Sequence, residues 1–556
     1  MSDPDQGLSL ASLLSAAARR GAVLVDRGKS TPVSEVESRV ARVAGGLAGL
    51  GIRPGDRVAI WLPNVSAWLE TFFAISRLGA IAVPVNTRFR ITEVENVLRR
   101  TGARVLVYWP GFKHIDFAGI LAGCDAASLT SLEAIVVYSE SDAETEAQPQ
   151  QTQSKRLVEY GSLSSAAATP DAGSSSSDCV MFTTSGTTKE PKLVLHVQRT
   201  LVRHASNVAN AWRLDPTSSV LLVPPMCGVY GFCTALAALA GGGALRMRPV
   251  WDANVAADEI TEAQCTHMTG TDDVYAQLLD ARPGVAVPFP SLRVAGFAAF
   301  NPALTGIVHR AEAHGLRLSG LYGTSEVLAL FSLRSAQADA SQRPLAGGFA
   351  VSAAAKVRTR DPEEDRLLPH GEAGALEIWA PESRMVRYFG NEEATGAALT
   401  SDGWYRTGDL GYTTDDGAFV YLSRLGDTLR LGGFLVSPAE IEAVVKESAG
   451  VGSCQVVGVV RPGGLRAIAF VIPEPGKAIA EEELASHVRQ RLASFKVPER
   501  FFFVDAFPVT ESANGSKITK NKLRQMAETL LHPRPVCICE IRDGAVFPPS
   551  AATCSS

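Results

Sequence analysis

The sequence predicts an α/β protein with a large N-terminal domain of doubly wound, mostly parallel sheets, a small antiparallel subdomain, and a small α+β C-terminal domain. Three observations predict this class. Strand, helix and strand patterns repeat in the first part of the chain, short strands separated by turns fill residues 351–421, and helices alternate with strands from residue 432 onward. Repeated strand–helix–strand units are typical of parallel sheets covered by helices.

The N-terminal repeats follow from hydrophobic periodicity. Apolar residues recur at helical spacing in residues 33–50, "GIRPGD" interrupts the pattern, and residues 57–62 have the composition of a strand. A second helix is expected at residues 66–78, before the strand "AIAVPV", and a third near residues 92–100, before the strand "ARVLVY". This order predicts a doubly wound sheet.

The middle and the end of the chain differ in composition. Residues 161–178, "GSLSSAAATPDAGSSSSD", are of low complexity, which is typical of a linker. A helix at residues 197–212 and the strand "LLVPPM" follow. "GALEIWA" and "GAFVYL" are short strands near turns and predict the antiparallel subdomain. Residues 529–556 show no periodicity and are expected to form a tail.

Composition limits the class of protein and its partners. At 556 residues the chain is too long for one hydrophobic core, so two or more domains are expected. A net charge of −5 indicates no nucleic-acid partner, and the absence of a run of about 18 uncharged apolar residues indicates no integral membrane segment. Nine scattered cysteines favour reduced buried thiols, and Cys537 and Cys539 lack the second ligand pair of a zinc site. We therefore expect a cytoplasmic protein.

The stretch "MFTTSGTTKEPKLVLH" predicts a loop between two short strands, residues 180–182 and 193–195. Its hydroxyls, its glycine, and the ammonium groups of Lys189 and Lys192 favour a phosphate ligand. It differs from the common phosphate-binding loop, because Leu193 rather than Ser or Thr follows Lys192. On composition alone, a mobile surface loop is the alternative.

Four further stretches carry chemistry: "LYGTSE" at residues 321–326, "WYRTGDLG" at 404–411, "SRLGDTLRLGGFLVSPAEIE" at 423–442 and "NGSKITKNKLR" at 514–524. Together with "TTSGTTKEPK", in this order, they resemble the adenylate-forming superfamily of acyl-CoA synthetases, luciferases and peptide-synthetase adenylation domains, with acyl-CoA synthetases the most similar group. The resemblance covers about residues 10–528. It implies that a carboxylate attacks the α-phosphate of ATP, which gives acyl-AMP and pyrophosphate, and that a thiol then takes the acyl group.

The resemblance implies a nucleotide site. Its cofactor-binding residues are Thr184, Ser185, Gly186, Thr187, Thr188, Lys192, Tyr322, Gly323, Thr324, Asp409, Arg424 and Gly433. In the superfamily, the loop at residues 184–192 surrounds the β- and γ-phosphates. Tyr322 matches the aromatic residue that stacks on adenine, and Asp409 and Arg424 match the pair that binds ribose.

The resemblance also implies three catalytic residues. Ser325 matches the hydroxyl that contacts the α-phosphate, and Glu326 matches the carboxylate that binds Mg²⁺, a cation that prefers oxygen ligands. Lys517 matches the lysine that bridges the substrate carboxylate and the α-phosphate, where its charge offsets the developing negative charge. The implied cofactors are ATP, Mg²⁺ and coenzyme A.

The resemblance divides the chain at a hinge. Residues 1–425 are expected to bind ATP and the acid, and residues 427–528 to form a mobile C-terminal domain that turns about Gly426, before the tail. Gly433 lies in the loop past which pantetheine threads in the superfamily, so coenzyme A is the expected acceptor. An acyl-AMP ligase that loads an acyl carrier protein and a non-catalytic nucleotide-binding relative are the alternatives. A monomer or a homodimer is expected.

Several of these residues have a structural alternative. Asp409 follows a glycine and fits a turn, while Ser325 and Glu326 fit a helix N-terminus. Arg424 fits an ordinary surface arginine. Lys517 fits a solvated lysine in the run "SKITKNK", where Lys520 or Lys522 could be confused with it.

The chain departs from the superfamily pattern at four positions. Lys189 and Ser516 stand where glycine is usual, so the phosphate loop is more cationic than average. Gly426 replaces the Lys or Asp of the hinge and leaves its backbone unobstructed. Gly228 replaces a histidine or aromatic residue and opens the acyl site.

The substrate is expected to be a hydrophobic acid. Members of the superfamily that activate amino acids commonly have an Asp just after the region that "PMCGVYGF" matches. The stretch "CGVYGFCTALAAL" contains no acidic residue, so the resemblance disfavours an amino acid. The stretches that line the acyl site in the superfamily correspond to residues 229–238, 295–300 and 327–331, all apolar or small. A fatty or aromatic acid gains roughly 0.8 kcal/mol for each methylene that it buries there. The expected role is therefore a ligase of fatty acid metabolism.

Overall fold

The structure is a computed structural model. It describes residues 7–140, 155–184, 191–300, 304, 306–427, 429–431, 434–461, 464–492, 494–512, 515–531, 540–542 and 545–547. The chain forms two compact units. The first comprises Met1–Leu422 and Glu511–Lys517, and the second comprises Ser423–Thr510 and Ile518–Ser556. The predicted α/β class is confirmed, whereas the hinge at Gly426 stays a prediction.

The first unit contains an eight-stranded sheet in the order β19-β9-β8-β4-β3-β5-β6-β7. Its strands are β3 (Arg57–Trp61), β4 (Ile81–Pro84), β5 (Val105–Tyr108), β6 (Ala134–Val137), β7 (Arg156–Glu159), β8 (Asp178–Thr183), β9 (Leu193–Val197) and β19 (Arg387–Tyr388). The strands from β8 to β7 along this order pair in parallel, while β9 pairs antiparallel with both β8 and β19. Helices α3 (Ser66–Arg77) and α4 (Ile91–Thr101) alternate with the first three strands, as predicted.

A thirteen-stranded sheet has the order β17-β18-β20-β21-β16-β15-β14-β13-β12-β10-β11-β1-β2. Its strands are β1 (Val23–Asp26), β2 (Lys29–Pro32), β10 (Ser219–Leu222), β11 (Ala244–Met247), β12 (His267–Thr271), β13 (Val294–Ala298), β14 (Leu318–Thr324), β15 (Leu328–Leu333), β16 (Gly347–Ala350), β17 (Lys356–Arg360), β18 (Gly374–Trp379), β20 (Tyr405–Thr413) and β21 (Phe419–Arg424). The strands from β1 to β14 along this order pair in parallel. On the other side of β14 the pairing is antiparallel, both from β14 through β15 and β16 to β21 and among β17, β18 and β20. The antiparallel part is the predicted subdomain.

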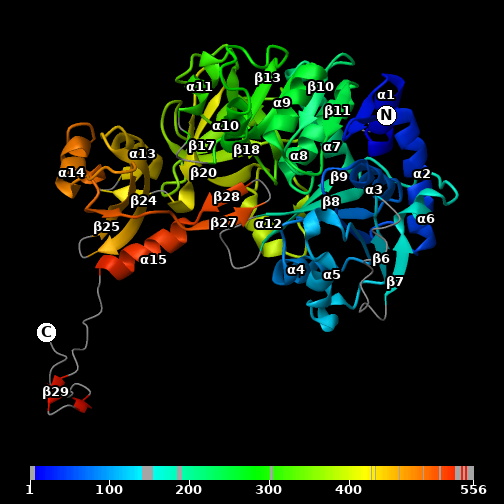
Figure 1. Ribbon diagram of the computed structural model, residues 1–556, viewed down its shortest axis with the longest axis horizontal. Helices are drawn as coiled ribbons and strands as arrows, with labels where there is room; N and C mark the ends of the chain where they lie inside the picture. Colours follow the sequence, from blue (N-terminus) through cyan, green and yellow to red (C-terminus); the bar gives the residue numbers. More distant parts are fainter. Residues whose placement is uncertain are drawn as a thin grey trace. The chain divides into compact units, whose positions relative to one another are not determined.

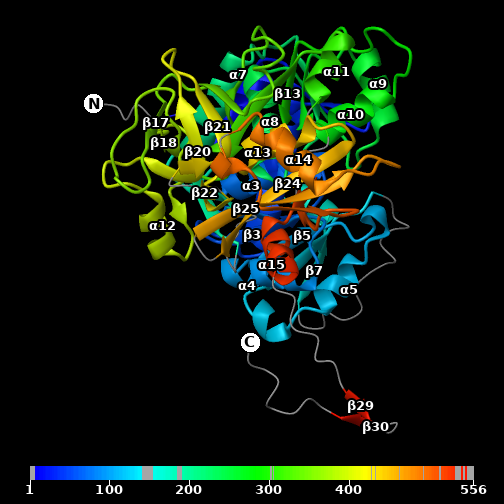
Figure 2. The ribbon, with the colours of Figure 1, turned by 90° about the vertical axis from the view of Figure 1, so that its left-hand side faces the viewer.

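Helices α3, α7 (Gln198–Ala211) and α8 (Val229–Gly241) form a layer that both sheets share (Figures 1 and 2). The ring of Phe232 on α8 lies 4.9 Å from that of Phe72 on α3 and 5.2 Å from that of Phe182 on β8. Nearly every residue of α8 is buried, as expected for a helix that is apolar on all sides. Because α8 also follows β10, this layer joins the two sheets into one unit.

The remaining helices of the first unit pack against other helices or against the sheets. They are α1 (Leu10–Arg19), α2 (Val33–Gly49), α5 (Phe117–Ala122), α6 (Tyr160–Ser164), α9 (Ala253–Glu262), α10 (Asp272–Asp280), α11 (Ile307–Ala313) and α12 (Glu392–Ala398). Helix α1 contacts α3, α7 and α8, α2 contacts α3 and α6, and α10 contacts β12. Of the helices in the described ranges of the chain, none combines the length and apolar character that a bilayer crossing requires.

The prediction of a linker at residues 161–178 is wrong. The end of this stretch packs against α2 and α3, where the Thr169 amide donates to the Ala41 carbonyl at 3.1 Å and the Ala172 amide to the Arg77 carbonyl at 2.8 Å. A Cβ on Gly45 of α2 would lie 1.8 Å from the Ala167 carbonyl oxygen, so only glycine permits this approach. Small residues suit both a flexible linker and a tightly packed strap, and composition alone does not separate the two.

The second unit is α+β, as predicted. Its strands are β22 (Leu429–Leu431), β23 (Phe434–Val436), β24 (Val451–Arg461), β25 (Gly464–Pro473), β26 (Arg500–Phe503), β29 (Glu540–Arg542) and β30 (Ala545–Phe547), and its helices are α13 (Pro438–Lys446), α14 (Glu481–Arg489) and α15 (Lys520–Leu531). The hairpin of β27 (Val509–Ser512) and β28 (Gly515–Ile518) is divided between the two units. Apolar side chains of β24 and β25 pack against α13 and α14 to form the core of this unit.

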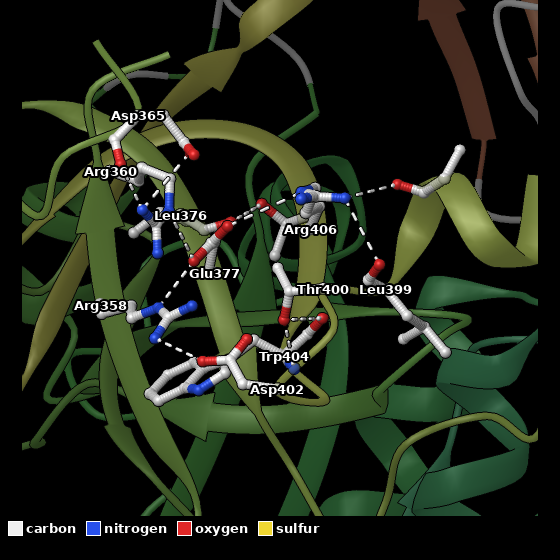
Figure 3. A network of polar contacts seen from close by, with 12 residues as sticks. Arg358, Arg360, Asp365, Leu376, Glu377, Leu399, Thr400, Asp402, Trp404 and Arg406 are labelled. Atoms are coloured by element: carbon white, nitrogen blue, oxygen red, sulfur yellow. Dashed lines mark hydrogen bonds and ion pairs between the residues drawn. The ribbon is translucent and has the colours of Figure 1, made fainter.

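A buried ion-pair network fixes β20 to β18. Glu377 on β18 is 2% exposed and accepts hydrogen bonds from Arg358 at 2.6 Å and from Arg360 at 3.2 Å. Figure 3 shows Arg406 of β20, which lies opposite Glu377 in the strand register, extending to the same carboxylate, with an ion-pair distance of 3.8 Å. Arg358 also donates to Asp402 at 3.1 Å. A buried carboxylate is therefore shared by three strands.

We predict that Glu377→Ala lowers the free energy of unfolding by about 1–3 kcal/mol, because three guanidinium groups lose their common buried acceptor. The measurement is urea unfolding followed by tryptophan fluorescence. Asp365→Ala is the matched control, since Asp365 pairs with Arg360 but its side chain is 85% exposed. Equal loss of stability in the two variants would show that the buried position of Glu377 does not matter.

Candidate functional site

The predicted loop is confirmed at its two ends. Strands β8 and β9 pair antiparallel, the Thr184 amide donates to the Lys192 carbonyl at 2.9 Å, and the Lys192 amide donates to Thr184 Oγ1 at 3.2 Å. Ser185, Gly186, Thr187, Thr188 and Lys189 lie outside the described residues. The Lys192 ammonium lies 4.6 Å from the ring centroid of Tyr388, a cation–π distance.

The segment "YGTSE" joins β14 to β15 and starts no helix, so the helix N-terminus alternative for Ser325 and Glu326 is wrong. The Glu326 amide donates to Thr324 Oγ1 at 3.2 Å, and the Glu326 carbonyl accepts from the Met385 amide at 2.6 Å. His196 Nε2 donates to the Ser325 carbonyl at 2.8 Å. The main chain at the predicted catalytic pair is therefore held by groups from both sheets.

The carboxylate of Glu326 is 8% exposed and accepts a hydrogen bond from the Tyr388 hydroxyl at 2.9 Å. No cluster of three or more His, Cys, Asp or Glu side chains suited to a metal ion occurs within the described residues. A single carboxylate nevertheless fits Mg²⁺, which proteins commonly bind through one or two carboxylates together with substrate phosphates. The donor set at Glu326 is of this kind.

Asp409 lies within strand β20 and is 2% exposed, so the alternative of a turn-capping aspartate is wrong. Between Arg406 and Leu410 the register of β20 with β18 shifts, which marks a bulge, and Gly408 there has φ of +71°. Thr407 Oγ1 accepts from the Asp409 amide at 3.0 Å. The bulge thus aims the Asp409 side chain inward.

The hydroxyl of Tyr322 donates to Asp409 Oδ2 at 2.5 Å. Four strand spacings separate β14 from β20 in the sheet order, or roughly 19 Å in a flat sheet. The antiparallel part of the sheet must therefore curl back over β14 to bring the two residues together. Tyr322 is buried with its ring 5.3 Å from that of Phe419, so its predicted stacking on adenine stays a prediction.

A third buried phenol lies near both carboxylates. Burial raises the pKa of Tyr405 well above its usual value, and the negative charges of Glu326 and Asp409 raise it further. Tyr405 is therefore neutral at physiological pH. The hydroxyls of Tyr388 and Tyr322 donate to Glu326 and Asp409, respectively, so neither of these two contacts places an opposite charge beside the carboxylate.

The remaining predicted residues are Gly323, Arg424, Lys517 and Gly433. A Cβ on Gly323 would lie 2.6 Å from the Ala329 Cα, so this glycine permits close packing of β14 on β15. Arg424 is exposed at the end of β21 and belongs to the second unit. Lys517 lies on β28, and Gly433 lies outside the described residues.

Sequence reasoning missed two buried histidines. His196 on β9 and His204 on α7 donate through Nε2 to the carbonyls of Ser325 and Ala329, at 2.8 and 2.7 Å. The register of β15 with β14 shifts here, which marks a bulge, and Leu328 and Leu330, on either side of Ala329, have φ of +68° and +64°, which leucine rarely adopts. The two imidazoles thus hold a strained bulge, but an isolated histidine in sequence gives no sign of this role.

Burial lowers the pKa of His204 from its usual 6.5 to about 4, so the imidazole is neutral in the folded protein. Between pH 6.5 and 4 the unfolded chain binds this proton and the folded chain does not. We therefore predict that the free energy of unfolding falls as the pH decreases through this window, by about 1.4 kcal/mol per pH unit for this one histidine.

The measurement is urea unfolding at pH 7.5, 6.0 and 5.0. His204→Gln keeps a donor for the Ala329 carbonyl and cannot titrate, so its stability should depend less steeply on pH than that of the wild type. The same slope in both proteins would show that His204 does not carry this dependence.

Residues 15–389 match the family model of the AMP-binding enzymes, and residues 440–514 match that of the AMP-binding enzyme C-terminal domain. The chain therefore belongs to the AMP-binding enzyme family. The predicted membership of the adenylate-forming superfamily is confirmed.

Two relatives and one solved structure illustrate the similarity. A methyl-dioxo-octahydro-indenyl-propanoyl:CoA ligase of Mycobacterium tuberculosis is 31% identical over 89% of this chain and 93% of the relative. A feruloyl-CoA synthase of an Amycolatopsis species is 30% identical over 90% and 94%, respectively. The crystal structure of ATP-bound MatB from Rhodopseudomonas palustris shares the fold, with a TM-score of 0.79 and 24% identity over 94% of this chain and 99% of that one. The predicted class of enzyme, an ATP-dependent acid–CoA ligase, is confirmed at this level.

Proposed function

We propose that the protein adenylates a hydrophobic fatty or aromatic acid with ATP and Mg²⁺, releases pyrophosphate, and transfers the acyl group to coenzyme A. The observation that carries this proposal is the meeting of Lys192, Glu326 and Asp409 around three buried tyrosines. These are one cation and two carboxylates at the positions that the superfamily uses for ATP.

Each residue has a role in the first half-reaction. Lys192 and the loop before it bind the β- and γ-phosphates, and Asp409 accepts hydrogen bonds from the ribose hydroxyls. Ser325 donates to the α-phosphate, and Lys517 offsets the charge that develops when the substrate carboxylate attacks it. When bound, Mg²⁺ neutralises phosphate charge, and Glu326 together with the phosphates would hold it.

The choice of acid rests on the lining of the expected acyl site. Helix α8, strand β13 and strand β15 supply apolar, mostly buried side chains. Gly228, the residue before α8, adds no side chain of its own to the site. Two of the relatives are named for acids that contain rings, which supports an aromatic or polycyclic acid over a short one.

Coenzyme A is the proposed acceptor, and an acyl carrier protein is the second candidate. We place the reaction in the cytoplasm, because six cysteines in the described residues are unpaired and buried, as suits a reducing compartment. As a ligase that activates fatty or aromatic acids, the protein would serve fatty acid metabolism or a related pathway, as a monomer or a homodimer.

The function is tested by measuring pyrophosphate release from ATP across a series of acids, from acetate to long-chain and aromatic acids, with and without coenzyme A. We predict higher kcat/KM for bulky apolar acids than for acetate. Gly228→His should lower kcat/KM more for bulky acids than for propionate, because the added ring fills the site. No pyrophosphate release with any acid would refute the proposed function, and equal losses across the series would place Gly228 outside the acyl site.

We further predict that the two half-reactions separate by mutation. Lys517→Ala should abolish pyrophosphate release and still convert supplied acyl-AMP to the thioester, because the lysine charge is needed only during adenylation. Gly433→Trp should make acyl-AMP and then stall, because a large side chain obstructs pantetheine. Single-turnover assays of each half-reaction measure both effects. Equal loss of both half-reactions in both folded variants would contradict a domain that alternates between two positions.

A further inference from the structure

Tyr388 lies on an edge strand next to the phosphate loop. Strand β19 pairs antiparallel with β9, and Tyr388 is the register partner of Val194. The Phe389 amide donates to the Leu193 carbonyl at 2.8 Å, so this short strand is fixed beside the residue that follows Lys192. The Tyr388 amide in turn donates to Thr395 Oγ1 at 3.0 Å. The backbone of Tyr388 is therefore held on both sides.

The side chain of Tyr388 is 3% exposed and contacts two residues of opposite charge. Its hydroxyl donates to Glu326 Oε1 at 2.9 Å, and its ring centroid lies 4.6 Å from the Lys192 ammonium. The same segment contacts Glu326 a second time, through the Met385 amide. One rigid side chain thus links the lysine of the phosphate loop to the glutamate of the other sheet.

Tyr388 contacts the Lys192 ammonium and the Glu326 carboxylate in two different ways, through its ring face and through its hydroxyl. A direct ion pair between Lys192 and Glu326 would neutralise both groups and leave neither for a ligand. The phenol donates to the carboxylate without cancelling its charge, and the ring face attracts the ammonium without forming a salt bridge. Tyr388 therefore contacts both groups without pairing one directly with the other.

We propose that Tyr388 is a positioning residue that holds Lys192 and Glu326 at a fixed separation, so that the ammonium and the Mg²⁺-binding carboxylate meet the phosphates of the same ATP. This inference rests on the proposed function. The hydroxyl orients the Glu326 carboxylate, which would hold Mg²⁺ together with the phosphates, and the ring holds Lys192 before ATP arrives. A hydrogen bond that orients a metal ligand commonly changes metal affinity 10–100-fold when it is lost.

A simple packing role is the alternative, since Tyr388 also packs with Val194, Tyr322 and Phe331. The two roles are separable, because packing needs the ring alone. Tyr388→Phe removes only the hydroxyl, whereas Tyr388→Leu removes the hydroxyl and the ring face. Tyr108→Phe is the matched control, because Tyr108 is buried on β5, away from the site, and stacks on Trp61.

The experiment measures Mn²⁺ binding by electron paramagnetic resonance in the presence of a non-hydrolysable ATP analogue, and analogue binding without metal by calorimetry. We expect Tyr388→Phe to weaken Mn²⁺ binding about tenfold and to leave metal-free analogue affinity unchanged. Tyr388→Leu should weaken both, and Tyr108→Phe neither. In turnover assays, Tyr388→Phe should require more Mg²⁺ for half-maximal rate.

Wild-type Mn²⁺ affinity in Tyr388→Phe would overturn the inference for Glu326. Equal metal-free analogue affinity in the Phe and Leu variants, both shown to be folded by circular dichroism, would overturn it for Lys192. If Tyr388→Leu does not fold, Tyr388→Phe alone tests the role of Tyr388 toward Glu326. Tyr388→Trp, which keeps an aromatic face, then replaces Tyr388→Leu in the test of Lys192, and we expect its metal-free analogue affinity to be unchanged. The binding assays need no turnover, so failure of the proposed function, seen as no pyrophosphate release by the wild type, is recognised separately.

Discussion

The anchoring of Glu326 across two sheets is the constraint on which the site depends. Glu326 follows β14 of the thirteen-stranded sheet, while Met385 and Tyr388, which bind its carbonyl and its carboxylate, lie at β19 of the eight-stranded sheet. His196 of that second sheet holds the neighbouring carbonyl of Ser325. Lys192 and Glu326 come from different sheets, so these few hydrogen bonds fix their separation.

The same region stores strain that its hydrogen bonds offset. Leucines at positive φ cost about 1–3 kcal/mol each, and the bulge of β15 contains two of them, Leu328 and Leu330. Two features stabilise the bulge. His204 donates to the carbonyl of Ala329, which lies between the two leucines, and the lack of a side chain at Gly323 lets β14 and β15 approach closely. Strain of this kind is typical of binding sites, where a fixed geometry matters more than local stability.

The sequence predicted the parts of the fold that repeat locally. The helices near residues 33–50 and 66–78 were predictable because their apolar residues recur at helical spacing. The packed strap at residues 161–178 was not, because its contacts with α2 depend on a glycine more than a hundred residues away. Tyr388 was missed for the same reason, since its partner Glu326 is 62 positions distant and no local pattern marks a tyrosine as a positioning residue. The motifs therefore named the charged residues of the candidate site, and the structure added the neutral groups that contact them.

Two buried glutamates of the first unit show why the neutral partner matters. Glu377 is 2% exposed and Glu326 is 8% exposed, so burial alone does not distinguish them. Three arginines surround Glu377 and neutralise it, which suits a group that joins strands and binds nothing else. Glu326 instead receives a hydrogen bond from a phenol, which brings no opposite charge, and electrostatic attraction for a cation is stronger in a buried setting than in water. An arginine in place of that phenol would pair with the carboxylate and compete with the Mg²⁺ that we propose Glu326 binds. The choice of partner, rather than burial, therefore decides whether a carboxylate in this protein stabilises the fold or binds a ligand.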